Sequence, residues 1–458
     1  MPAHFRDYAD PRIDEYRPAI LEPENDDKHR RLVRHGERLL SVVGKQLDDS
    51  ADGQRWQFPR FGKPKAVIEI REPKIVIPAM LEYADVGLFY THVEGMWGPD
   101  IEATPVPDDV ETGNPESDAM VMVAVGLQKA VRPIRKHAWA RSRRHEEEND
   151  AKSIAAWTPS AKRTKQEIAD HYDLTPEVYT GEYGFLDQKY VQYSSGLLAP
   201  SKTTESLEAM QEHKVTAIAD NLWLDTADTL IEIGGGWGGL AVALAERNPG
   251  LRITSLTVSH EQLLVAQQKA IDAGVADQID FREEDYRDHQ PEKPYDRLVS
   301  IEMLEAVDWR DHDDYFNHIN KFLAEDGRAL LQAIHIHSSQ WANQKHARSF
   351  ANTAIFPGGV LTPKDVIRQK MAERGLQVVG QETELGSSYA QTLREWRRNL
   401  EASRAALTGK WRGEGRSPAQ IERFYRGFGN IYLAWCQAGF MPQMNNIQAS
   451  QMTFRRAG

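Results

Sequence analysis

Short apolar segments alternate with longer amphipathic ones between about residues 221 and 336 of this chain. The short segments predict buried strands, and the amphipathic segments, whose apolar residues recur at helical spacing, predict helices. The predicted strands are 229–233, 252–256, 279–281, 297–301 and 329–336, and the predicted helices are 240–247, 261–273 and 313–323. This alternation is typical of a doubly wound α/β sheet.

The chain before this region has a different pattern. Residues 1–50 are strongly charged but place Leu32, Leu39, Leu40 and Val43 at helical spacing, which predicts a helix. Three short segments, 55–58, 66–70 and 74–77, predict strands. We therefore expect a small α+β accessory domain over residues 1–150.

Polar stretches and the tail complete the predicted organisation. Residues 102–118 are rich in proline and acidic side chains and predict an exposed loop. A polar stretch predicts a linker over 151–170, so that the main α/β domain covers 171–458. After residue 340 the chain is rich in aromatic residues and predicts a helical tail.

Length and composition limit where the protein can work. A chain of 458 residues exceeds one ordinary hydrophobic core, which supports two domains. The single cysteine, Cys436, cannot form an internal disulfide, no apolar stretch is long enough to cross a bilayer, and residues 1–15 do not resemble a signal peptide. We therefore expect a cytoplasmic protein. The net charge of −12 argues against a nucleic-acid partner.

One local segment is basic despite the acidic total. Seven Lys and Arg residues lie between Lys129 and Arg144, with no acidic residue and with Ile134 and Trp139 among them. Basic charge beside an aromatic ring suits an anionic membrane surface, and a solvated helix face is the alternative. We expect peripheral contact with the inner face of the membrane.

A glycine-rich loop follows the first predicted strand of the α/β region. The segment from Glu232 to Gly239 runs directly into a predicted helix, and its glycines permit a tight turn and close approach of a ligand to the backbone. The spacing suits both a dinucleotide (Gly234, Gly236, Gly239) and a methyltransferase cofactor (Gly234, Gly236, Gly238). The loop alone leaves both classes open, together with a purely structural turn.

The end of the second predicted strand favours the methyltransferase cofactor. A dinucleotide site requires an acidic residue about 20 positions after the loop, whereas residues 255–259 contain no carboxylate. Thr257 and Gln262 are candidate partners for a ribose. Asp285 and Tyr286, after the third predicted strand, are candidate partners for an adenine.

Several ordered blocks resemble the cyclopropane-fatty-acid synthase and mycolic-acid methyltransferase family. These blocks are 171–174 with 193–195, 232–239, 256–262, 296–305 and 355–359, followed by 389–396 and 432–440. The likeness covers residues 165–458, and agreement across so many ordered blocks is more specific than any single one. It implies a Rossmann-like methyltransferase sheet with a helical tail on the lipid side. It also implies S-adenosylmethionine as cofactor and an unsaturated acyl chain, as in a phospholipid, as substrate.

The resemblance implies a set of cofactor residues beginning with Glu232, which opens the glycine loop. Within this set, Tyr193 and Ser194 would contact the amino-acid end of S-adenosylmethionine, Gly234, Gly236 and Gly238 its methionyl and ribosyl parts, Thr257 and Gln262 the ribose, and Asp285 and Tyr286 the adenine.

A second implied set surrounds the reacting carbons, where the family holds a bicarbonate ion. Glu305 and Tyr389 match that set, whereas Ser195 stands where many members have Cys, Gln332 where they have His, and Glu302 where they have Gly. A neutral amide holds an anion less firmly than an imidazolium does. We therefore expect a protein carboxylate to take over part of the work of bicarbonate. The alternative is that Glu302 points to solvent or pairs with an arginine.

The implied reaction sets requirements that these residues can meet. A carbon–carbon double bond is a weak nucleophile, so methyl transfer requires in-line geometry in a dry pocket. Aromatic rings such as Tyr389 can stabilise the resulting cation, although core packing explains most aromatic residues of the tail equally well. Glu305 then removes a proton, to give a cyclopropane ring or, as we favour slightly, a methylene or methyl branch. His335 and His337 lack a third ligand nearby, so we predict no metal.

Two other functions remain open at this point. One is a methyltransferase of the same fold that acts on a small polar acceptor, and the other is a non-catalytic lipid-binding subunit. The sequence also leaves open a homodimer and a reductase that acts on the product.

Overall fold

The computed structural model describes two parts of the chain. These are residues 20–131, apart from 22–26, 51–52, 61 and 63–64, and residues 176–456, apart from 346–348, 357–358 and 445–446. The predicted linker 151–170, the block 171–174 and the basic residues from Arg132 to Arg144 lie outside the described residues. The domain boundaries therefore stay predictions.

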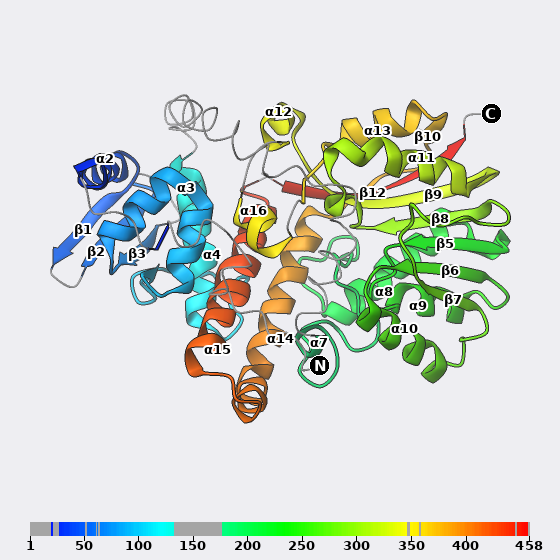
Figure 1. Ribbon diagram of the computed structural model, residues 1–458, viewed down its shortest axis with the longest axis horizontal. Coiled ribbons are helices and arrows are strands. Elements are labelled where there is room, and N and C mark those ends of the chain that lie inside the picture. The colour runs from blue at the N-terminus through cyan, green and yellow to red at the C-terminus, as the bar shows by residue number, and fades with distance from the viewer. Residues whose placement is uncertain are drawn as a thin grey trace.

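An eight-stranded sheet forms the α/β part of the protein, on the right in Figure 1. Its strands are β5 (Thr229–Ile233), β6 (Arg252–Thr257), β7 (Ile279–Glu283), β8 (Tyr295–Ile301), β9 (Leu323–Ile336), β10 (Leu376–Val378), β11 (Thr383–Glu384) and β12 (Ile447–Arg456). They follow the order β10-β12-β9-β8-β5-β6-β7, with β11 paired to β12. The pairings among β5 to β9 are parallel, whereas β12 runs antiparallel to β9.

The strand order reverses at β5, which lies between β6 and β8. In open α/β sheets a ligand binds at such a switch point, beyond the carboxyl ends of the strands. The sheet therefore confirms the predicted doubly wound class and directs attention to the loops that follow β5 and β8.

Helices cover both faces of this sheet. The helices α8 (Leu207–Leu222), α9 (Gly239–Arg247) and α10 (His260–Asp272) lie on one face, and α11 (His312–Phe322) and α13 (Lys364–Ala372) lie on the other (Figure 1). Each face has its own buried apolar cluster, one around Phe316 and the other around Leu244. Burial on both faces explains the consecutive buried residues of the central strands β5, β8 and β9, whereas the edge strand β7 is largely exposed.

A second, antiparallel sheet lies at the other end of the molecule. It has the order β1-β2-β3-β4, with strands β1 (Lys45–Ser50), β2 (Gly53–Phe58), β3 (Ala66–Ile70) and β4 (Trp97–Pro99), and it is accompanied by α2 (Asp27–Val43), α3 (Pro73–Val93) and α4 (Pro115–Val131). This is the α+β unit that the sequence predicts.

Two predictions within this unit are wrong. Residues 74–77 form the first turn of α3 rather than a strand, because Pro73 stands at the start of the helix, where its fixed φ is favourable. The predicted loop 102–118 ends early, since α4 begins at Pro115 and buries Ser117 and Asp118.

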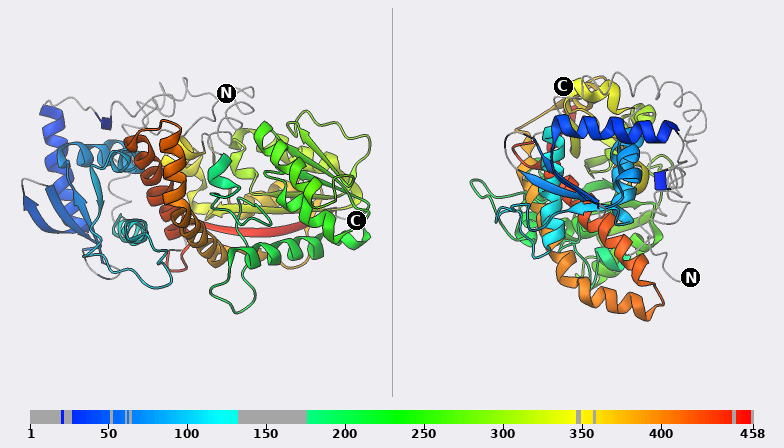
Figure 2. Two further views of the ribbon diagram at one scale, coloured as in Figure 1. Left: turned by 90° about the horizontal axis from the view of Figure 1, so that it is seen from below. Right: turned by 90° about the vertical axis from the view of Figure 1, so that its left-hand side faces the viewer.

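Helices of the tail lie between the two sheets (Figures 1 and 2). They are α14 (Gly386–Gly413), α15 (Pro418–Phe424), the π-helical η6 (Tyr425–Leu433) and α16 (Ala434–Phe440), with α7 (Pro176–Tyr179) beside them. The remaining short elements are η1 (Leu224–Thr226), η2 (Leu304–Ala306), η3 (Trp309–Asp311), η4 (Ser338–Gln340), α12 (Trp341–Gln344) and η5 (Ala351–Ile355). The tail is not helical throughout, because β10, β11 and β12 extend the sheet. Among the described helices, none has an apolar stretch sufficient to span a bilayer.

The tail helices share one hydrophobic core with the N-terminal unit. A single buried cluster extends from Trp56 in β2 to Trp396 in α14. Within it, the guanidinium of Arg397 on α14 forms a buried ion pair with Asp118 on α4 and donates a hydrogen bond to the Ser117 hydroxyl over 2.9 Å. This pair links segments far apart in the sequence.

Breaking the buried ion pair should destabilise the protein strongly. In Arg397→Met the Asp118 carboxylate stays buried without its guanidinium, so we expect the free energy of unfolding to fall by about 3–5 kcal/mol in urea denaturation. The control is Arg282→Met on β7, where the arginine and its partner Asp280 are 46% and 55% exposed. The control should lose less than about 1 kcal/mol of unfolding free energy. Equal losses in the two variants would contradict the stabilising role of the buried Arg397–Asp118 pair.

Candidate functional site

The loop after β5 forms the floor of a pocket at the switch point. Gly234, Gly236 and Gly238 have φ values of 85°, 53° and 77°, a backbone conformation that glycine adopts without strain. A Cβ atom built on Gly236 would have no protein atom within 4 Å. The backbone of this loop is therefore open to a ligand at the start of α9.

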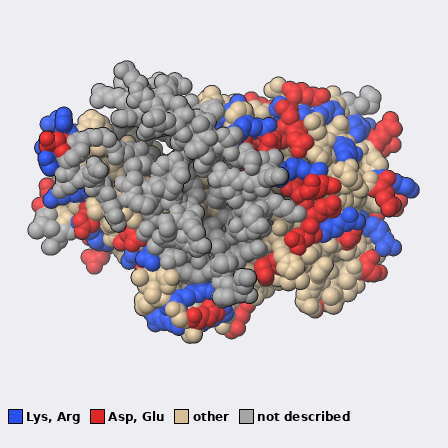
Figure 3. Space-filling view, in the orientation of Figure 1, with Lys and Arg blue, Asp and Glu red and all other residues tan. Residues whose placement is uncertain are grey.

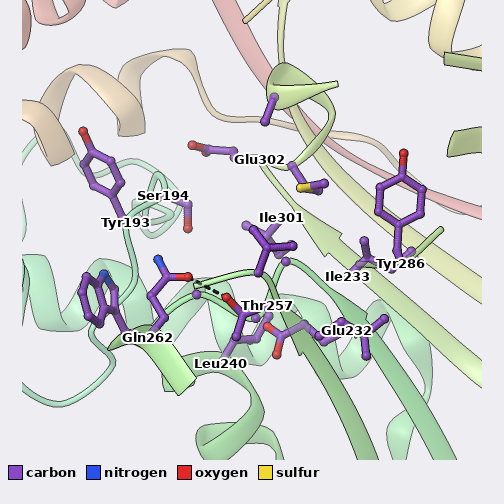
Figure 4. A pocket seen from close by; sticks show the side chains of 18 of the residues that line it. Tyr193, Ser194, Glu232, Ile233, Leu240, Thr257, Gln262, Tyr286, Ile301 and Glu302 are labelled. Atoms are coloured by element: carbon purple, nitrogen blue, oxygen red, sulfur yellow. Dashed lines mark hydrogen bonds between the residues drawn. The ribbon is translucent and has the colours of Figure 1, made fainter. Parts of the chain in front are cut away.

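The loops after β5, β6, β7 and β8 surround this pocket (Figure 4). Nine of the ten predicted cofactor residues line it, namely Tyr193, Ser194, Glu232, Gly234, Gly236, Thr257, Gln262, Asp285 and Tyr286. Gly238 does not line it, which corrects the prediction for that residue. A Cβ on Gly238 would lie 2.5 Å from the Cβ of Ala266, so this glycine allows α9 to pack closely against α10.

Hydrogen bonds hold the polar walls of the pocket in place. The Thr257 hydroxyl lies 2.8 Å from Gln262 Oε1, as the dashed line in Figure 4 shows. Asp285 accepts bonds from Arg287 Nε at 2.9 Å and Nη2 at 2.6 Å, an arginine that the sequence analysis missed. Burial raises the pKa of Glu232 to about 7, and its carboxylate accepts a bond from the Ser255 hydroxyl over 2.6 Å.

Two buried donors in the pocket lack a partner among the described residues. These are Trp237 Nε1 and Gln192 Nε2. Buried donors are normally satisfied, so a ligand with acceptor atoms fits here. S-adenosylmethionine has such acceptors in its carboxylate, ribose and adenine, so the pocket meets the expectation drawn from the resemblance.

A buried lysine that the sequence analysis missed stabilises one side of the pocket. Lys214 on α8 is completely buried, and its ammonium donates to the Ser194 hydroxyl over 2.7 Å. Burial lowers the pKa of Lys214 to about 7, although the carboxylates of Glu302, Asp187 and Glu232 oppose this shift. Lys214 therefore fixes the orientation of Ser194 at the edge of the pocket.

The carboxylate of Glu302, just after β8, is bound by donors from three elements. It accepts hydrogen bonds from the Ser195 N–H at 3.0 Å, from Gln332 Nε2 at 2.8 Å and from the Tyr389 hydroxyl at 2.6 Å. The structure thus brings together four of the five predicted catalytic residues. The alternative that Glu302 faces solvent or an arginine is wrong.

The role of Ser195 differs from the one its position implies. Its backbone N–H binds Glu302, whereas its hydroxyl donates to the Gly196 carbonyl over 2.8 Å. The side chain at this position therefore does not reach the carboxylate.

Glu302 has a strained backbone. Its φ is +51°, in the left-handed region that favours glycine, and such strain in other residues typically costs about 1–3 kcal/mol. Its N–H donates to the Gln332 carbonyl over 2.7 Å, which helps to hold this conformation. The strain accounts for the glycine that the resembling family has at this position.

Glu305, the fifth predicted catalytic residue, lies in η2 beside Glu302. Its Oε1 accepts a bond from the Ile334 N–H, while its Oε2 is buried with no hydrogen-bond partner among the described residues. Burial, and secondly the nearby charge of Glu302, raise the pKa of Glu305 to about 8. Burial also raises the pKa of Glu302, although the bond from Tyr389 opposes this. Glu305 can therefore exchange a proton near neutral pH.

Aromatic rings from the tail close the side of the site opposite the sheet. The hydroxyls of Tyr193 and Tyr432 are 3.0 Å apart, and the Tyr432 ring meets Phe356 with centroids 5.8 Å apart. Tyr389 stacks on Phe440 with centroids 4.2 Å apart. These rings form an apolar wall beside the two carboxylates.

The histidine pair singled out in the sequence takes part in local bonds. His335 Nε2 lies 2.7 Å from the Ser450 hydroxyl, and His337 Nδ1 lies 2.8 Å from the Ser339 hydroxyl. Over the described ranges, no three His, Cys, Asp or Glu residues are grouped as metal ligands.

Known proteins share this fold and sequence. The chain is 29% identical over 304 residues to the tuberculostearic acid methyltransferase UfaA1 of Mycobacterium tuberculosis, which covers 65% of this chain and 67% of that protein. It is 29% identical over 273 residues to the sphingolipid C9-methyltransferase A of Emericella nidulans, covering 58% of this chain and 49% of the relative. The match thus spans only about half the length of the fungal protein.

Solved structures of other proteins share the fold of this chain. The cyclopropane synthase MmaA2 from Mycobacterium tuberculosis is 25% identical with a TM-score of 0.53, covering 63% of this chain and 97% of that one. The mycolic acid cyclopropane synthase CmaA1, solved with SAH and CTAB, also has a TM-score of 0.53, at 24% identity, covering 64% of this chain and 98% of that one.

The family model described as mycolic acid cyclopropane synthetase matches residues 159–452, well over half of the chain. Together with the pocket, the family match and the methyltransferase relatives identify S-adenosylmethionine as the cofactor. The chain therefore belongs to the mycolic acid cyclopropane synthetase family of S-adenosylmethionine-dependent methyltransferases.

Proposed function

We propose that this protein transfers a methyl group from S-adenosylmethionine to the double bond of an unsaturated fatty acyl chain, carried by a phospholipid, and forms a methylene or methyl branch. One observation carries the proposal: the half-buried carboxylate of Glu302 lines the cofactor pocket, accepts a bond from Tyr389 of the aromatic wall, and is close enough to Glu305 to raise its pKa.

The substrate class is supported by the relatives and by the site. The relatives of this chain are methyltransferases named for tuberculostearic acid, for fatty acids and for sphingolipids. The wall formed by Tyr193, Phe356 and Tyr432 is apolar and suits an acyl chain rather than a small polar acceptor. Peripheral contact at the cytoplasmic face of a membrane would supply that acyl chain. Of the basic segment 129–144, the structure describes only residues 129–131.

The residues of the site match the demands of the reaction. S-adenosylmethionine, when bound, supplies an electrophilic methyl group. The alkene electrons form a bond to this methyl carbon as its bond to the cofactor sulfur breaks, and the sulfur keeps that electron pair. A positive charge is left on the neighbouring alkene carbon, and the faces of Tyr193 and Tyr432 can stabilise it. A proton must then leave the acyl chain, and we assign this step to Glu305, whose Oε2 has no hydrogen-bond partner among the described residues.

Glu302 replaces bicarbonate in this proposal. In the resembling family the residues that match Ser195, Gln332 and Tyr389 surround a bicarbonate ion, and here donors from these three residues bind the carboxylate of Glu302 instead. A carboxylate attached to the chain provides the same negative charge and acceptor atoms without a freely diffusing ion. Its charge also keeps the pKa of Glu305 high.

The branched product requires no further reactant up to the methylene stage. Loss of a proton from the cation neutralises it and forms either a ring or a new double bond. A saturated methyl branch additionally needs a hydride and a proton, which a separate reductase would have to supply.

The direct test is incubation of the full chain with S-adenosylmethionine and vesicles of dioleoyl phosphatidylglycerol. Extraction, mass spectrometry and proton NMR should show one added CH2 unit per modified chain and an exocyclic methylene signal. A cyclopropane signal would overturn the branched product but not the methyltransferase. Cofactor binding without lipid product would favour a lipid-binding subunit or a different acceptor.

The cofactor loop should not tolerate a side chain at its most open position. In Gly236→Val the added methyl groups project into the pocket, so we expect affinity for S-adenosylmethionine to fall at least about tenfold in calorimetric titration. Gly274→Val is the matched control, because Gly274 also has positive φ (+71°) and open surroundings but does not line the pocket. Equal affinities for S-adenosylmethionine in the two folded variants would show that the loop takes no part in cofactor binding.

Removal of the Glu302 side chain should create a requirement for bicarbonate. We expect Glu302→Gly to bind S-adenosylmethionine normally but to turn over slowly, and added bicarbonate should restore much of the rate by filling the vacated space. Glu302→Gln keeps the volume without the charge and should be slow with or without bicarbonate. Full activity of Glu302→Gln would contradict the role of the carboxylate.

Glu305 should set the pH dependence of turnover. Only the ionised carboxylate accepts a proton, so kcat should rise with pH along a limb near its pKa of about 8. Glu305→Gln should lower kcat by about 10²–10⁴-fold while leaving cofactor affinity intact. Glu302→Gln should move the limb to lower pH, because loss of the neighbouring negative charge lowers the pKa of Glu305. If the limb stays at the same pH in Glu302→Gln, the charge of Glu302 does not set the pKa of Glu305.

A further inference from the structure

A second cavity, of about 590 Å³, lies where the end of α3 meets α14, α15 and η6. It shares no lining residue with the cofactor pocket. Its charged lining consists of four arginines and two glutamates, namely Arg404, Arg412, Arg423, Arg426, Glu94 and Glu422. The cavity is thus locally positive in a chain whose net charge is −12.

The ion pairs of Arg404 and Arg426 are loose. The nitrogen–oxygen distances are 3.4 Å for Arg404–Glu422, 3.5 Å for Arg404–Glu401 and 3.6 Å for Arg426–Glu422. Strong charge-assisted bonds between such groups are about 2.7–2.9 Å long. Guanidinium groups here remain able to bind a better-placed anion.

The arginines are positioned by the fold. A Cβ on Gly95, whose φ is +76°, would lie 2.8 Å from Arg426 Nη1, so the absence of a side chain allows this guanidinium to approach the backbone after α3. The Arg404 guanidinium lies over the Tyr425 ring, 4.4 Å from its centroid. The side chains of Arg404 and Arg426 are 28% and 30% exposed. Figure 3 shows positive and negative side chains gathered at the lower edge of the molecule, where α14 and α15 lie.

We propose that this cavity binds a phosphate group. Guanidinium groups present paired N–H donors that match the oxygens of phosphate, and several of them around one cavity favour an anion with more than one oxygen. The phosphate could belong to a phospholipid head group or to a free phosphate ion.

Aromatic contacts connect the cavity with the reaction site. Tyr425 lines the cavity and contacts Phe424, which stacks on Phe428 at 5.6 Å, and Phe428 contacts Tyr432 at 5.4 Å. The Tyr432 hydroxyl then meets that of Tyr193. These rings are buried in the core, so the two sites lie at the two ends of one packed aromatic row. Use of the cavity by a phospholipid substrate rests on the proposed function, whereas the phosphate site itself does not.

The test is calorimetric titration of the full chain, saturated with S-adenosylmethionine, with inorganic phosphate and with monomeric dihexanoyl phosphatidylglycerol. Both ligands should bind the wild type and should bind Arg412→Gln/Arg426→Gln at least about tenfold more weakly, since each lost charge-assisted bond is worth about that factor. Arg398→Gln, which removes one arginine of α14 outside the cavity, should bind like the wild type. Unchanged cofactor affinity will show that the double variant is folded.

Each outcome decides between the sources. Weakened binding of both ligands supports a phosphate site used by lipid. Binding of inorganic phosphate without the phospholipid supports the site but overturns the lipid source. No binding of either ligand, or equal binding by the double variant, overturns the proposal. A wild type that binds phosphate at the cavity yet methylates no lipid would refute the proposed function alone.

Discussion

The structure of the site depends on one carboxylate that is partly withdrawn from water. Glu302 is half-buried on the wall of the pocket and loses part of its hydration, and three donors replace that part, from the segment before α8, from β9 and from α14. An unpaired buried charge would be very costly, so these three segments must meet at one point. The position of the tail against the sheet follows from this requirement, and so does the strained backbone that places the carboxylate there.

Four buried ionisable groups share this region, and their protonation states depend on one another. Lys214 is close enough to Glu232 and Glu302 to influence both, and Glu302 influences Glu305. In such a set, protons are gained and lost by the group rather than by single residues. Binding of a cofactor that carries a positive sulfonium and a carboxylate would therefore redistribute protons within the whole cluster.

The regular α/β region could be predicted closely from sequence, because burial on both faces gives β5, β8 and β9 runs of apolar residues. β12 was missed, because its Gln451 and Ser450 are buried polar residues that interrupt the pattern. The glycine loop and the carboxylates were found through local motifs and resemblance. Lys214 could not be found in this way, since only tertiary contacts show that the single lysine of α8 faces inward.

The position of β12 has a consequence for the synthesis of the protein. This strand lies between β9 and β10, and its Gln451 donates to Gln332, the residue that binds Glu302. A ribosome makes residues 337–446 after β9 and before β12, which takes on the order of ten seconds at typical rates. During that time one edge of β9 is unpaired, and an open edge invites pairing with other chains. The nascent protein therefore passes through a period in which its sheet is incomplete and its catalytic centre cannot yet form.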